Sequence, residues 1–170
     1  MSPGERVDTV FAFIEHSALS EWIRGSDSLL AFPAIITLHA LGLGFLAGGG
    51  AAIDLRLLGF APAVPLKALA RFLPVLWLAF TVNAISGTLL LIAYPTKALT
   101  NPLFYAKLGL ITLAVFLVYR IGTVLRGGEA GGNARPLAAL SLATWLLLIL
   151  AGRFLAYTHR WELLGVPAIL

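Results

Sequence analysis

The chain has 170 residues, of which 59% are hydrophobic and only 12% charged, with a formal net charge of +4. Soluble domains carry about 25% charged residues, so this chain lacks the polar surface of a soluble protein and we predict an integral membrane protein. Its basic residues lie singly, not in a run interleaved with aromatic residues, which excludes a nucleic-acid-binding surface. The lack of cysteine excludes disulfides, thiolate-bound zinc, iron–sulfur clusters and covalently attached haem.

The first predicted element covers residues 5–24. Its apolar side chains recur at roughly helical spacing, and most of its charged side chains fall on the other face. We interpret it as a short amphipathic helix lying in the membrane interface. Charged residues come before any apolar run, so we expect no signal peptide.

Four apolar segments follow, each close to the roughly 20 residues that cross a bilayer as a helix. We expect these spans at residues 28–53, 72–94, 102–124 and 136–158. Short connections make neighbouring spans antiparallel. The sequence therefore predicts one membrane domain, residues 1–170, with an all-α fold: a four-helix up-and-down bundle preceded by the interfacial helix.

The distribution of Lys and Arg indicates an orientation. The basic residues divide equally between the two membrane faces, but on one face several belong to the interfacial helix or to span ends. Cytoplasmic connections are usually enriched in Lys and Arg. We expect the 54–71 and 126–135 connections in the cytoplasm and both termini in the periplasm of a bacterial inner membrane.

His39 is the most informative residue, because an ionisable side chain at membrane depth is costly and marks a functional site by default. Asn83 lies at a similar depth in the next span, so the two side chains would meet on adjacent antiparallel helices. Gly42 and the glycines after it would leave room for a flat macrocycle or let the helices pack closely. His39 has three possible roles: it binds a cofactor, it forms an interhelical hydrogen bond, or it handles a proton or substrate.

Two cations form a second candidate site. Lys107 lies just inside the start of the third span and Arg153 just inside the end of the fourth, so both belong to one membrane face. They would orient haem propionates, a quinone head or an anionic lipid, or each would reach the interface alone. At the opposite face we expect Asp54 to pair with Arg120, and Arg56 is a candidate partner for an acidic ligand group.

The other histidines offer no second haem ligand. His16 belongs to the interfacial helix, and His159 lies about 15 Å from His39 in depth by helical rise. A haem at His39 would therefore need another type of ligand, water or an open position. The sequence contains no nucleophile–base arrangement, phosphate loop or pair of catalytic carboxylates, so an enzymatic activity is left undecided.

Several segments together resemble a known family: FPAIITLHALGLGFLAGG, DLRLLG, NPLFYAKLGLITLA and the closing LSLATW and GRFLAY. Over residues 28–158 they are similar to an uncharacterised family of small four-span bacterial inner-membrane proteins, itself distantly similar to the CopD copper-resistance and HemJ protoporphyrinogen-oxidase groups. The shared elements are His39 before a Gly-rich turn, and Asn101-Pro102 leading to Lys107.

The resemblance implies a role in haem binding for His39 and Lys107, which correspond to residues so implicated in the HemJ-like group. Two departures qualify it. A second histidine of that group is replaced by Tyr119 and Arg120, and Met1 is the only methionine, which disfavours copper transport.

These features predict a membrane component of a redox system that binds haem b or interacts with quinone. His39 would ligate the haem iron or donate a hydrogen bond, Asn83 would support it, and the cations would orient acidic cofactor groups. One alternative is a cofactor-free accessory or scaffold subunit of a larger membrane complex. Another is a small transporter or proton path, weakened by the lack of a second membrane-embedded acid. The expected partners are the lipid bilayer and other membrane subunits or a second copy of the chain.

Overall fold

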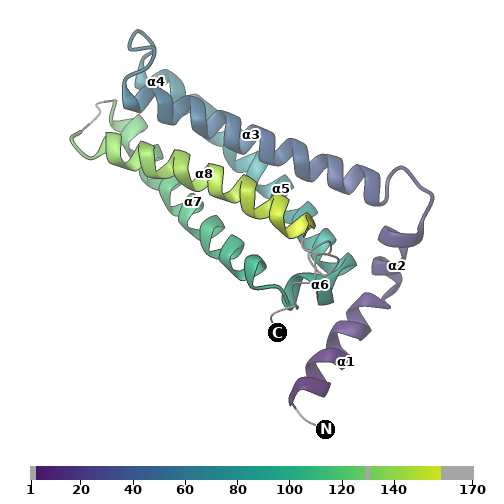
Figure 1. The fold of residues 1–170 in the computed structure, drawn as a ribbon. Coiled ribbons are helices and arrows are strands. Elements are labelled where there is room, and N and C mark those ends of the chain that lie inside the picture. The colour runs from purple at the N-terminus through teal and green to yellow at the C-terminus, as the bar shows by residue number, and fades with distance from the viewer. Residues whose placement is uncertain (1–2, 129–130, 158–170) are drawn as a thin grey trace.

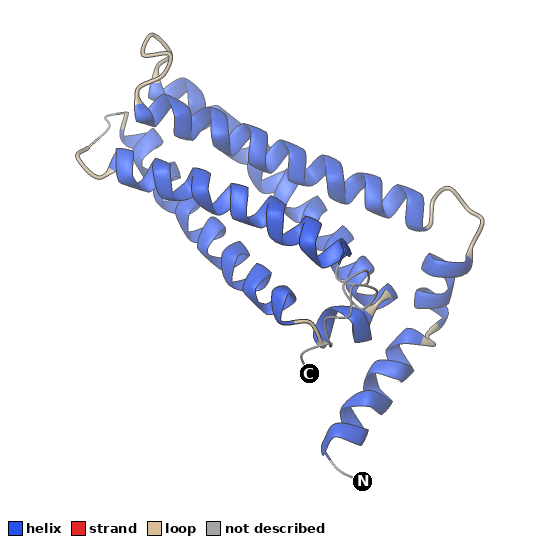
Figure 2. Cartoon of the chain, viewed as in Figure 1, coloured by secondary structure: helices blue, strands red, loops and turns tan. Residues whose placement is uncertain are grey.

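The computed structural model describes residues 3–128 and 131–157. Within these residues every element of secondary structure is a helix, and loops or turns connect the helices (Figure 2). Four helices are long and apolar enough to span a membrane, which confirms the all-α four-span bundle (Figure 1). They are α3 (Phe32–Leu58), α5 (Leu73–Ala93), α7 (Pro102–Gly127) and α8 (Ala134–Tyr157). The protein is a multi-pass membrane protein.

The spans pack in the order α5, α3, α8 and α7, because α3 packs against both α5 and α8, and α8 also packs against α7. The core is apolar and draws on all four spans, for example through Leu46, Leu76, Ile121 and Leu148. The outward faces are apolar too, and large side chains are exposed along every span. A helix that is apolar all round belongs in a membrane, so these outward faces contact lipid.

The first span lies four to five residues further along the chain than predicted. Pro33 stands in the first turn of α3, where proline is favoured because the missing N–H has no intrahelical partner. The helix ends at Gly59, whose φ of 111° is left-handed and whose N–H donates to the Arg56 carbonyl. Asp54 therefore lies inside α3, where it faces the interior of the bundle and is 1% exposed.

Short helices fill connections that were predicted as loops. Before α5, helix α4 (Leu66–Leu69) and the 3₁₀ helix η1 (Ala70–Phe72) extend the second helical stretch back to Leu66. Helix α6 (Pro95–Leu99) follows α5. Part of the Gly-rich connection (129–130), the last residue of the predicted fourth span and His159 lie outside the described residues.

The predicted interfacial helix is divided in two, α1 (Pro3–Glu15) and α2 (Ala18–Gly25). Ser17 causes the division. Its hydroxyl donates to the Ile14 carbonyl at 2.6 Å and accepts from the Ser20 N–H at 3.4 Å, so one side chain ends α1 and caps α2.

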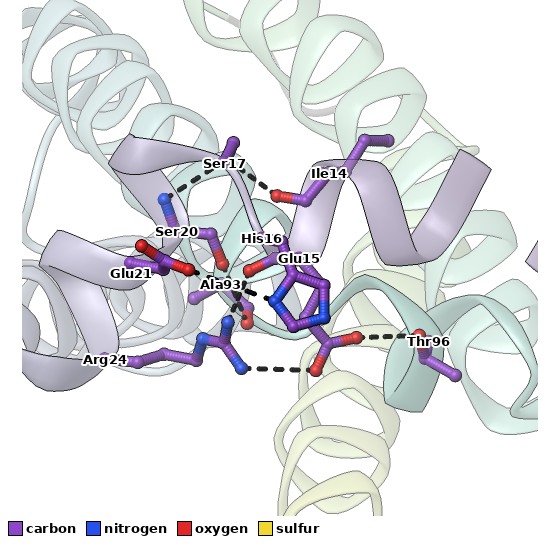
Figure 3. Close-up of polar contacts among 9 residues, drawn as sticks. All are labelled: Ile14, Glu15, His16, Ser17, Ser20, Glu21, Arg24, Ala93 and Thr96. Carbon is purple, nitrogen blue, oxygen red and sulfur yellow. Dashed lines mark hydrogen bonds and ion pairs between the residues drawn. The ribbon is translucent and has the colours of Figure 1, made fainter. Parts of the chain in front are cut away.

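Helices α1 and α2 are fixed to the end of the bundle where α5 meets α6 (Figure 3). Glu15 pairs with Arg24 at 3.2 Å and accepts a hydrogen bond from Thr96 of α6 at 2.8 Å. Ser20 donates to the Ala93 carbonyl at 3.4 Å, and Ile23 is fully buried against Ala93. The N-terminal segment is thus part of the folded domain.

Candidate functional site

The structure brings His39 and Asn83 together across the α3–α5 interface, as their depths predict. Each side chain bonds to the backbone of the other residue. His39 Nδ1 lies 3.2 Å from the Asn83 carbonyl oxygen, and Asn83 Nδ2 donates to the His39 carbonyl at 2.7 Å. The two bonds fix the relative position of the helices at this depth.

The partners of His39 define where its proton lies. A carbonyl oxygen only accepts, so Nδ1 must carry the proton that it shares with the Asn83 oxygen. Ser86 Oγ also lies 3.1 Å from Nδ1, and the Val82 carbonyl at 2.7 Å and the Asn83 carbonyl at 3.2 Å are both acceptors for its proton, so with Nδ1 protonated Ser86 accepts from His39 as well. In the neutral imidazole this leaves the lone pair on Nε2, and none of the hydrogen bonds described for His39 uses that atom.

Glycines on both helices make this contact possible. A Cβ atom placed on Gly42 would lie 3.2 Å from both the Ala79 carbonyl oxygen and Asn83 Cβ. A Cβ atom on Gly87 would lie 3.1 Å from Cε1 of His39. Gly42 thus serves close helix packing, the simpler of the two roles predicted for it, whereas Gly87 provides room for the imidazole.

Lys107 lies close to this site and Arg153 does not point into it. The charge of Lys107 acts on the His39 imidazole, and its Nζ lies 4.0 Å from the position of a Cβ atom on Gly152 of α8. Lys107 is half-buried, whereas Arg153 is exposed. The predicted pair of cations therefore shares one end of the bundle, but only Lys107 is directed towards its interior.

Arg56, the candidate partner for an acidic ligand group, bonds to the backbone of its own connection. Its guanidinium donates to two carbonyls of the α3–α4 loop, from Nε to Val64 at 2.7 Å and from Nη2 to Pro62 at 2.9 Å. It also lies at the opposite end of α3 from His39. Arg56 holds the loop that follows α3.

The predicted pair of Asp54 and Arg120 is not formed. Neither carboxylate oxygen of Asp54 has a hydrogen-bond partner. Arg120 is exposed, and its guanidinium carbon lies 5.8 Å from the centre of the Phe116 ring, where a cation–π contact replaces the ion pair. The prediction that the spans lack a second embedded acid is also wrong, because Asp54 lies within α3 and is buried.

Ser86 and Gly87 were missed from the sequence, although Ser86 lies three residues after Asn83 and so on the same helical face. Trp145 and Ser141 of α8 were missed too. They lie four residues apart on the face of α8 that meets α3. Within the described residues, no group of three or more His, Cys, Asp or Glu side chains is placed to hold a metal ion.

Searches with this chain against family models, curated proteins and solved structures find no match. Its function has to be inferred from the geometry of the site.

Proposed function

We propose that the protein is a membrane component of a redox system that binds haem b or a quinone beside His39. The observation that carries the proposal is the bond from His39 Nδ1 to the Asn83 carbonyl, which directs the remaining lone pair to Nε2. Metal-binding histidines characteristically donate their other ring N–H to a carbonyl or carboxylate, which fixes the tautomer and the ring orientation.

The proposal uses the same atom for either cofactor. Nε2 of His39 would ligate a haem iron or accept the hydroxyl proton of a quinol. Lys107 at the same end of the bundle would neutralise a propionate or donate to a quinone oxygen. Arg153, exposed at the end of α8, is available to an acidic group at the membrane surface. The cofactor supplies the electron transfer, while these side chains bind and orient it.

The test compares wild-type protein with His39→Gln, both purified from membranes. The amide of Gln can still donate to the Asn83 carbonyl but cannot ligate haem iron, so the variant separates ligand binding from helix packing. We expect a haem Soret band or an extractable quinone in the wild type and its loss in His39→Gln. His16→Gln, on the exposed α1–α2 connection, is the matched control and should retain the cofactor.

Wild-type protein that contains neither cofactor, or His39→Gln protein that retains it unchanged, contradicts the proposal.

A cofactor-free accessory subunit is the second candidate. The reciprocal bonds between His39 and Asn83 favour it, because they use both polar side chains as contacts between helices. On this account, wild-type protein purifies without haem or quinone as part of a larger membrane complex, and His39→Gln changes its stability but not its chemistry. A transporter or proton path through His39 and Asn83 has no comparable observation in its favour, since both side chains bond to backbone carbonyls.

We also propose that the protein lies in a bacterial inner membrane with its termini in the periplasm. The exposed cations support this orientation. Five of them gather at the end of the bundle where α3 finishes: Lys67, Arg71, Arg120, Arg126 and Arg135. At the other end Lys97 and Arg153 are exposed, whereas Arg24 is paired with Glu15 and Lys107 points inwards.

A further inference from the structure

A second polar site lies in the other half of the bundle, and it contains buried groups without partners. Both carboxylate oxygens of Asp54 and Nε1 of Trp145 are buried and make no hydrogen bond. The two residues are 1% and 7% exposed. Buried polar atoms in proteins are nearly always paired with protein or with ordered water, so these atoms indicate a bound partner.

Asp54 and Trp145 approach each other beside Gly50. A Cβ atom on Gly50 would lie only 2.8 Å from Trp145 Nε1. Gly50 and Asp54 are four residues apart on α3, which places them on one face with about 5–6 Å between Cβ positions. The indole N–H of α8 therefore lies over Gly50, one turn of α3 before Asp54.

A small cavity adjoins the carboxylate. Its volume is about 10 Å³, and Asp54 and Ser141 are the polar residues in its wall. Gly50, over which the Trp145 N–H lies, and apolar residues of α3, α5 and α7 complete the wall: Ile53, Leu73, Leu76, Val118 and Ile121. This is about the space that a single water molecule needs, and a water is stable only where polar groups can bond to it.

We infer that this site binds one water molecule and one exchangeable proton. The water accepts from the Trp145 N–H and donates to the Asp54 carboxylate, which satisfies both residues at once. A metal cation fits less well, because an N–H group offers it no lone pair. Asp54 takes up and releases its proton, and its position one turn before the end of α3 puts the aqueous phase within reach.

Among the residues that the structure describes, no charged side chain shares the cavity with Asp54, and its polar neighbour there is the Ser141 hydroxyl. The wall contributed by α5 and α7 is apolar, and α8 contributes the hydroxyl of Ser141. The cations of the adjoining elements, Lys67 on α4, Arg71 on η1, Arg126 on α7 and Arg135 on α8, are all exposed. None of them lines the cavity, so they compete little with the water for the carboxylate.

Infrared difference spectroscopy of the purified wild-type protein at high and low pH tests the inference. We expect a carboxylic C=O band that comes and goes with pH and is absent in Asp54→Asn. We also expect an O–H stretching band that shifts in water labelled with heavy oxygen. Trp145→Phe keeps an aromatic side chain but removes the N–H donor, so it should abolish the water band. Asp27→Asn, at the exposed opposite end of the bundle, should leave both bands unchanged.

Three results would overturn the inference. The first is that the wild-type protein and Asp54→Asn show the same carboxylic bands. The second is a carboxylic band without a water band sensitive to Trp145→Phe. The third is a change caused by sodium and lost in Asp54→Asn, which would make the site a cation site. Each variant's helical circular dichroism shows that it is folded, and Trp145→Phe keeps the inference testable should Asp54→Asn fail to fold.

Discussion

His39 and Asn83 join α3 to α5 through two reciprocal hydrogen bonds. Lipid provides no hydrophobic force between spans, so α3 and α5 depend on close packing and on polar contacts. An interhelical hydrogen bond in a membrane contributes about 0.6 kcal/mol on average. Two such bonds at one depth fix the register of the helices, and neither of them uses Nε2 of His39.

Gly42 should be less tolerant of substitution than its neighbour Gly44. In Gly42→Ala the new methyl group meets the Ala79 carbonyl oxygen at 3.2 Å, and backbone cannot swing aside. Overpacking of this kind costs about 1–3 kcal/mol. Nothing lies within 4 Å of a Cβ atom on Gly44, so Gly44→Ala is the matched control. Thermal unfolding in detergent should show a lower midpoint for Gly42→Ala alone, and equal midpoints would contradict the packing described here.

The contact between His39 and Asn83 could be predicted, because depth along a span follows from residue number in antiparallel neighbours. The directions of Lys107 and Arg153 could not. These spans are apolar almost all round, so hydropathy does not define which face of each helix points inwards. Rotation about the helix axis is decided by packing, and packing turns Lys107 inwards and Arg153 outwards.

At the scale of elements, the four spans could be predicted and their ends could not. The first span is predicted to end at Ile53, because the charged Asp54 follows. In the structure the helix continues through Asp54, whose side chain faces the protein interior instead of lipid. Gly59 was the better signal, since a left-handed residue is what ends α3. Likewise, Ser17 before Ala18 marks a capped helix start inside what looked like one amphipathic helix.

The whole molecule has two unlike ends. One contains the half-buried Lys107, the His39 site and the docked N-terminal helices, and the other contains the larger group of exposed cations and the Asp54 cavity. Because cytoplasmic connections attract Lys and Arg, the cation-rich end should face the cytoplasm and the His39 site should lie nearer the periplasm.

Labelling of single cysteines tests this orientation, and the chain has no native cysteine to remove. Asp27→Cys and Gly132→Cys place one thiol at each end, at exposed positions. In intact bacterial cells a membrane-impermeant maleimide should label Asp27→Cys, and it should label Gly132→Cys only after lysis. The reverse pattern would invert the orientation.

The most direct test of the account is nitrogen NMR of protein labelled in its histidine rings. His39→Gln identifies the His39 signals by their disappearance. At a pH where the imidazole is neutral, we predict a proton on Nδ1 and an unprotonated Nε2, since Nδ1 donates to the Asn83 carbonyl. A proton on Nε2 would contradict the account, because that nitrogen could then neither ligate iron nor accept the proton of a quinol.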